Sequence, residues 1–259
     1  KKVANLLSKS QRPVLHLGQG VKISEGQNFL RKLINKSKIP FALTWNASDL
    51  IESNHPYYIG RPGAIAERGT NFIIQNCDLL ISVGSRLPYM VTGYNYKDFA
   101  KHAKKVFVDI DKFEVENHYL SFDLQINSDA NIFFNILYNK INKFKFSKNL
   151  QWLNYCHFIK NKYPLISSKI KEQKKFVNSY YFVDKLSQKL NSNSTVVTDM
   201  GLSFVGTYQA FKVKKNQKIY TNSGHAPMGW GLPAAIGAYY ANKKNTIICL
   251  SGDGGLQMN

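Results

Sequence analysis

The chain has 259 residues, of which 44% are hydrophobic and 20% are charged, which is the composition of a globular protein and excludes a disordered one. No apolar run approaches the roughly 18 residues of a membrane-spanning helix, and the N-terminus shows no signal peptide, so we expect a cytoplasmic protein without a membrane partner. The net charge of +19 comes from lysines scattered over the whole chain. Because basic runs interleaved with aromatic residues are missing, no nucleic-acid partner is expected.

The first half of the chain alternates apolar runs with amphipathic segments. Four runs have the length of buried strands, 12–18, 41–45, 78–84 and 105–111, and all but the second of them end in Gly or Asp. Between the first two, Ser24 is predicted to cap a helix, with Gln27 as its capping-box partner. A loop is predicted over 53–64, followed by a helix that ends near Asn76. Strands and helices in alternation predict an α/β fold with a doubly wound parallel sheet.

A second alternation follows a segment rich in Lys and Asn. Its predicted elements are a helix at 179–190, strands at 195–199 and 218–221, a helix of small residues at 232–241 and a strand at 246–250. This pattern predicts a second doubly wound parallel sheet. We therefore divide the chain into a first domain at 1–145, a linker with a connecting helix at 146–178, and a second domain at 179–259.

The strongest chemical motif is Gly252-Asp253-Gly254-Gly255, which directly follows an apolar strand. Glycines let the backbone approach a phosphate, and the N–H groups of a following helix favour anionic oxygens. An aspartate in such a turn supplies a hard oxygen ligand for Mg²⁺, which can bridge a diphosphate. An ordinary β-turn with an aspartate cap is the alternative. The segments VVTDMG (196–201) and MGWGLPAAIGA (228–238) precede this motif.

The order of these motifs resembles the diphosphate-binding domain of thiamine-diphosphate-dependent enzymes of the acetolactate synthase type. The first half resembles the central domain of the same family in the segments RPVLHLGQGV, CDLLISVGSR and VFVDID. The resemblance implies a carboligase or decarboxylase, a transferase or lyase, that acts on 2-oxo acids by ylid attack on a carbonyl followed by decarboxylation. It also implies a homodimer or homotetramer. A non-catalytic nucleotide-binding module of the same fold is the alternative.

The resemblance assigns a role to individual residues of the second half. Asp253 matches the Mg²⁺ ligand, and Met228 matches the apolar residue that wedges between the two rings of the cofactor. The carbonyl of Ala226 matches the acceptor for the pyrimidine amino group. His225 is either an acid or base that acts on the substrate or a structural histidine bonded to nearby backbone. The residues assigned to the cofactor are Gly201, Ser203, Gly224, Gly252, Gly254 and Gly255.

The central domain of this family holds FAD in some members, ADP in others and no nucleotide in the rest. The positions that match nucleotide contacts are Gly18, Gly20, Gly60, Gly63, Gly84, Arg86 and Asp109. Whether the first domain of this chain binds FAD, ADP or no nucleotide stays open, because the segment 87–90 departs from the acidic and basic residues found in acetolactate synthase. The family's catalytic Glu and second metal ligand match nothing in this sequence. We therefore expect a fragment that is inactive on its own.

Overall fold

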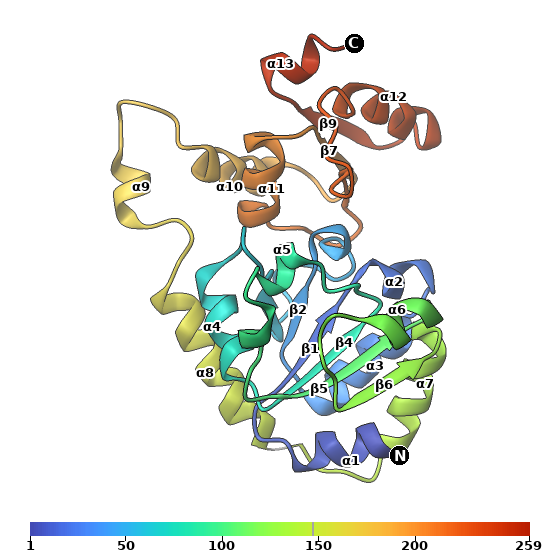
Figure 1. Ribbon diagram of the computed structural model, residues 1–259. Helices are drawn as coiled ribbons and strands as arrows, with labels where there is room; N and C mark the ends of the chain where they lie inside the picture. The colour runs from blue at the N-terminus through green and yellow to red at the C-terminus, as the bar shows by residue number, and fades with distance from the viewer. Residues whose placement is uncertain (147) are drawn as a thin grey trace. The chain divides into compact units, whose positions relative to one another are not determined.

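The computed structural model describes residues 1–146 and 148–259 and contains two parallel sheets, each flanked by helices (Figure 1). The chain divides into two compact units. The first comprises Lys1–Leu50 and Pro56–Pro164, and the second comprises Ile51–His55 and Leu165–Asn259. The predicted α/β class with two doubly wound sheets is confirmed. Among the helices of the described residues, none combines the length and the hydrophobicity needed to cross a bilayer.

The first unit is built on a six-stranded sheet in the order β3-β2-β1-β4-β5-β6, in which all neighbours are parallel. Its strands are β1 (Pro13–Leu17), β2 (Phe41–Leu43), β3 (Tyr58–Gly60), β4 (Leu79–Val83), β5 (Lys104–Asp109) and β6 (Leu124–Asn127). β1 and β4 are buried along their whole length, which explains their uninterrupted apolar sequences. The strand order reverses between β1 and β4, and open α/β sheets bind ligands at such a point.

Helices cover both faces of this sheet. They are α1 (Lys2–Lys9), α2 (Gln19–Ile23), α3 (Gln27–Ser37), α4 (Arg68–Asn76), α5 (Tyr89–Thr92), α6 (Lys112–Asn117), α7 (Ala130–Ile141) and α8 (Lys148–Lys162), with 3₁₀ turns η1 (Trp45–Ala47) and η2 (Tyr96–Asp98). α3 packs against α7 on one face, and α4 packs against α8 on the other (Figure 1). Helix α8 buries Trp152, Cys156 and Ile159 in the core, and Trp152 Nε1 donates to the Pro13 carbonyl at 3.1 Å.

Two local predictions in the first half are wrong. Ser24 does not cap a long helix, because its hydroxyl donates to the Val21 carbonyl at 3.1 Å and closes the short α2, while α3 begins at Gln27. The predicted loop at 53–64 contains strand β3. A three-residue strand that pairs with only one neighbour carries too little apolar periodicity to be found from sequence. Strand β6, at the other edge, alternates exposed and half-buried residues and was missed for the same reason.

The second unit has a three-stranded parallel sheet in the order β8-β7-β9. Its elements are α9 (Ser168–Glu172), α10 (Ser179–Lys189), β7 (Ser194–Thr198), α11 (Leu202–Ala210), β8 (Lys218–Tyr220), α12 (Gly231–Ala241), β9 (Thr246–Leu250) and α13 (Asp253–Leu256). The central strand β7 is fully buried. α12 packs on β7 and β9, and α11, which the sequence analysis did not predict, packs on α10 and β7.

Candidate functional site

The motifs of the second half meet at one edge of the second sheet. Asp199 and Gly201 follow β7, and the loop Ser251–Gly255 follows the neighbouring β9. Because β7 and β9 are parallel, their carboxyl ends lie at the same edge. Helices α11 and α13 both begin there, with Gly201 and Gly252 as their N-caps. This edge is where open α/β sheets place their ligands.

The loop after β9 leaves room for an anion at two of its three glycines. A Cβ atom added at Gly252 or Gly254 would meet no atom within 4 Å. A Cβ atom at Gly255 would lie 1.8 Å from the Asp199 carboxylate, so this glycine is required by packing within the protein. The first N–H groups of α13 have no acceptor within the helix. Open backbone and free N–H groups fit a diphosphate.

Asp253 is the exposed first residue of α13, so its carboxylate is accessible to a cation. Within the part of the chain that the structure describes, no group of three or more His, Cys, Asp or Glu side chains gathers to hold a metal ion. Mg²⁺ retains oxygen ligands from phosphates and water and needs only one or two carboxylates from the protein. The donor set at Asp253 therefore fits Mg²⁺ bound together with a phosphate.

The turn before α12 presents Met228 to solvent. Its side chain is 58% exposed, so Met228 does not fill the core of this unit. The imidazole of His225 is also exposed and forms no hydrogen bond with any of the described residues. The backbone N–H of His225 donates to Asn222 Oδ1 at 3.5 Å. Ala226 lies in the left-handed region, with φ at 51°. A residue other than glycine is strained in this conformation.

Replacing Ala226 by Gly is expected to stabilise the second unit by about 0.5–1 kcal/mol, because a side chain in the left-handed region is strained. The measurement is the free energy of unfolding in urea. Ala238→Gly is the matched control. It changes the same side chain inside α12 and is expected to destabilise by about 0.5–1 kcal/mol. Equal destabilisation by both substitutions would contradict the assigned backbone strain.

The remaining residues assigned to the cofactor lie around the same loops. Gly201 has φ at 79°. A Cβ atom added at Gly201 or at Gly224 would meet no atom within 4 Å. The hydroxyl of Ser203 donates to the Met200 carbonyl at 2.9 Å, in the first turn of α11. Gly201 is the residue here whose backbone demands glycine, because a positive φ strains any other residue.

Three glycines of the first unit bring two loops together at the switch point. A Cβ atom at Gly18 would lie 2.0 Å from the Gly84 carbonyl oxygen, and the Gly20 N–H donates to that oxygen at 3.0 Å. Gly84 has φ at 59°. Beside them lies a cavity of about 180 Å³, lined by Gly20, Gly84 and Asp109 among others. These four predicted residues therefore lie close together.

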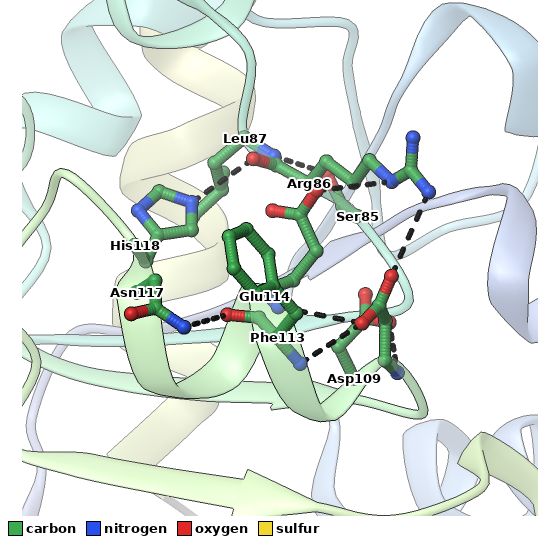
Figure 2. Close-up of polar contacts among 9 residues, drawn as sticks. Ser85, Arg86, Leu87, Asp109, Phe113, Glu114, Asn117 and His118 are labelled. Carbon is green, nitrogen blue, oxygen red and sulfur yellow. Dashed lines mark hydrogen bonds and ion pairs between the residues drawn. The ribbon is translucent and has the colours of Figure 1, made fainter.

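The other three residues predicted to contact a nucleotide lie outside this cavity. Gly60 and Gly63 both have positive φ values, and added Cβ atoms would clash with Thr70 Oγ1 and the Met90 carbonyl. Arg86 is directed toward α6 (Figure 2). Its guanidinium is 3.4 Å from Glu114 and 3.9 Å from Asp111, and its side chain is 71% exposed. A phosphate that binds Arg86 would compete with these carboxylates.

His118 holds the backbone of Arg86, a contact that was not predicted from the sequence. The Leu120 N–H donates to His118 Nδ1 at 3.0 Å, so Nε2 carries the hydrogen and donates to the Arg86 carbonyl at 3.0 Å (Figure 2). The ring stacks against Tyr119, with 4.7 Å between centroids. No sequence signal marked this histidine, because its partners are backbone groups brought together by the fold.

Comparison with known proteins agrees with this geometry. Residues 1–137 match the family described as thiamine pyrophosphate enzyme, central domain, and residues 199–259 match its C-terminal TPP binding domain. The chain belongs to the thiamine pyrophosphate enzyme family. The C-terminal match contains both loops at the carboxyl edge of the second sheet, from Asp199 to the turn around Asp253.

Similar proteins are acetolactate synthase large subunits. That of isozyme 2 from Escherichia coli (strain K12) is 30% identical over 254 residues, which cover 98% of this chain and 44% of the relative. That of Cyanidium caldarium is 32% identical over 263 residues, which cover 100% of this chain and 44% of the relative. The probable large subunit of Methanococcus aeolicus is 30% identical over 272 residues, which cover 100% of this chain and 45% of the relative. The chain thus spans less than half the length of these relatives.

Proposed function

We propose that the full-length protein is a thiamine diphosphate- and Mg²⁺-dependent carboligase or decarboxylase of 2-oxo acids, similar to acetolactate synthase. The observation that carries the proposal is the open loop at Gly252 and Gly254, beside the exposed carboxylate of Asp253, at the carboxyl edge of a parallel sheet. The match of residues 199–259 to a thiamine pyrophosphate binding domain and the names of the relatives support it.

Each residue has a role in this proposal. Asp253 would hold Mg²⁺, and the first N–H groups of α13 would bind diphosphate oxygens. The exposed Met228 side chain would support the cofactor by apolar contact, and the Ala226 carbonyl would accept a hydrogen bond from it. Thiamine diphosphate bound there would supply the carbon nucleophile and the electron sink that decarboxylation of a 2-oxo acid requires.

The exposed imidazole of His225 would move a proton to or from the substrate. Gly201, Ser203 and Gly224 would line the diphosphate, where the open space around both glycines fits a bound group. A Glu and a second metal ligand from outside residues 1–259 would complete the site, so the chain by itself would be inactive. The proposal includes a homodimer or homotetramer in the cytoplasm.

A nucleotide site in the first unit is part of the proposal. The cavity at the switch point, which Gly20, Gly84 and Asp109 help to line, supports binding of FAD or ADP by a central domain at residues 1–145. The cofactor domain would occupy residues 179–259. Purified protein with a flavin absorption spectrum would identify FAD, and a rise in Tm on addition of ADP alone would identify ADP.

The decisive experiment uses the full-length protein with pyruvate as the probe substrate. Thiamine diphosphate with Mg²⁺ is expected to raise the Tm and to allow release of carbon dioxide from pyruvate. Replacement of pyruvate by other 2-oxo acids would then identify the preferred substrate. The proposal would be overturned if the Tm did not change and no 2-oxo acid released carbon dioxide. A non-catalytic nucleotide-binding module would instead respond to ADP or FAD and not to thiamine diphosphate.

A further inference from the structure

Asp199 is a buried carboxylate at the centre of the candidate site. It directly follows β7, the middle strand of the second sheet, and is 1% exposed. Its backbone N–H donates to the Leu250 carbonyl at 2.8 Å, which continues the pairing of β7 with β9. The side chain is therefore fixed at the sheet edge where the loops meet.

The carboxylate of Asp199 joins two loops that are far apart in sequence. Oδ2 accepts hydrogen bonds from the Gly229 N–H at 3.1 Å and from the Ser251 hydroxyl at 3.0 Å. Oδ1 accepts from the Gly231 N–H at 3.3 Å. Gly229 directly follows Met228, Gly231 begins α12, and Ser251 begins the loop that carries Asp253. One side chain thus contacts both halves of the proposed cofactor site.

Two glycines of these loops are explained by Asp199. A Cβ atom at Gly231 would lie 2.8 Å from the Cβ atom of Asp199, and one at Gly255 would lie 1.8 Å from its Oδ2 atom. Such contacts exclude any larger residue. A Cβ atom at Gly252 or Gly254 would meet neither this carboxylate nor any other atom within 4 Å. The glycines of the loop therefore divide into those that fit Asp199 and those available to a ligand.

The donors that surround Asp199 are neutral. None of the ion pairs among residues 1–146 and 148–259 includes it. Burial raises the pKa of the Cys249 thiol, and the negative charge of Asp199 raises it further. A buried carboxylate that accepts three hydrogen bonds holds its donors strongly, because bonds to a charged acceptor are about twice as strong as neutral ones.

A second, more exposed contact joins the same loops. The Asn259 side chain donates to the Gly229 carbonyl at 3.1 Å and to the Gly255 carbonyl at 3.3 Å. Since Asn259 is exposed and Asp199 is buried, water competes with the hydrogen bonds of Asn259 and not with those of Asp199.

We infer that Asp199 is a positioning residue, which holds the Met228 turn and the Asp253 loop at the separation at which both contact one cofactor. The inference rests on the proposed binding of thiamine diphosphate. Asp199 itself would touch neither the cofactor nor the metal, since its oxygens are occupied by Gly229, Gly231 and Ser251.

The test measures thiamine diphosphate affinity in the full-length protein at saturating Mg²⁺, followed by the fluorescence of Trp230, which lies between the two bonded glycines. Asp199→Asn keeps the shape of the side chain but leaves one oxygen for three donors. It is expected to weaken binding about 10- to 100-fold. The control Asp184→Asn alters another buried carboxylate of the same unit, which pairs with Lys212 at 2.7 Å, and is expected to lower Tm without changing affinity.

Ser251→Ala provides a second variant that removes one donor and retains the carboxylate. It is expected to weaken binding less than Asp199→Asn does, and the double variant is expected to bind as weakly as Asp199→Asn alone, because Ser251 acts through Asp199. Additive losses, or an Asp199→Asn variant with reduced Tm and unchanged affinity, would overturn the inference.

Amide hydrogen exchange in the cofactor-free protein separates this inference from the proposed function. Asp199→Asn is expected to accelerate exchange over 227–231 and over 251–257 together, since both segments lose the same anchor. Acceleration in one segment only would contradict the linkage, whether or not the wild-type protein binds thiamine diphosphate. If the wild-type protein does not bind thiamine diphosphate, the proposed function is wrong, and Asp199 then has no role in positioning that cofactor.

Discussion

Replacement of Asp253 by Asn is expected to abolish the rise in Tm that thiamine diphosphate and Mg²⁺ together give the full-length protein. Asp253 is exposed at the first turn of α13, and among the described residues it belongs to no group of three or more His, Cys, Asp or Glu side chains that could hold the ion. A neutral amide is a much weaker Mg²⁺ ligand than a carboxylate. The ion that links the diphosphate to the protein would therefore be lost.

The expected magnitude follows from binding linkage. A ligand at 100 times its Kd stabilises the folded state by about 2.7 kcal/mol, which raises Tm by several degrees. Asp253→Asn should lose this entire rise while the Tm without ligand changes little, since the carboxylate lies at the surface. Differential scanning fluorimetry across a series of Mg²⁺ concentrations measures both quantities.

Glu172→Gln is the control for Asp253→Asn. It removes one negative charge from an exposed position in the same unit, at the end of α9, and should retain the full response to the cofactor. An undiminished response of Asp253→Asn would show that the metal binds elsewhere. Loss of the response in both variants would point to the overall charge of the unit instead of a specific ligand.

Much of the fold could be predicted from the sequence because its central strands are buried on both faces. β1, β4 and β7 read as uninterrupted apolar runs, and their alternation with helices leads directly to doubly wound sheets. The edge strands β3 and β6 were missed. β3 is buried but only three residues long, and β6 alternates exposed and half-buried residues, so neither shows the apolar run of a central strand. Helix α11 was missed since its apolar residues show no clear 3.6-residue periodicity.

The candidate site was predictable where a motif is continuous in sequence. Asp253 and Met228 each lie inside such a motif, and their structural placement is an exposed position at the edge of the second sheet. The contacts of Asp199 are different, because its partners lie 30 to 52 residues away. From the sequence alone, Asp199 is predicted only to end a strand. Only the fold shows that Gly231 and Gly255 are small to accommodate it.

His16 makes the stability of the first unit depend on pH. It lies in the middle of β1, is completely buried, and its Nδ1 atom is 3.1 Å from the Ser82 hydroxyl. Nε2 is buried without a hydrogen-bond partner among the described residues. Burial lowers the pKa of His16 from 6.5 to about 4, because a charged imidazole cannot be solvated there.

Since the folded state binds this proton more weakly than the unfolded state, acid favours unfolding. The stability that depends on neutral His16 is fully present above pH 6.5 and is lost progressively as the pH falls to about 4. A tenfold change in proton affinity corresponds to about 1.4 kcal/mol, so the loss over this range is about 3 kcal/mol.

His16→Gln is expected to remove this loss, because glutamine keeps a polar group near Ser82 and does not titrate. The measurement is urea unfolding at several pH values from 7.5 to 4, followed by the fluorescence of Trp152, which is buried in the first unit. The wild-type free energy of unfolding should fall by about 3 kcal/mol more than that of His16→Gln. The control His102→Gln, at an exposed position, should follow the wild type. Parallel curves for wild type and His16→Gln would mean that His16 is protonated in the folded protein and that the sheet accommodates its charge.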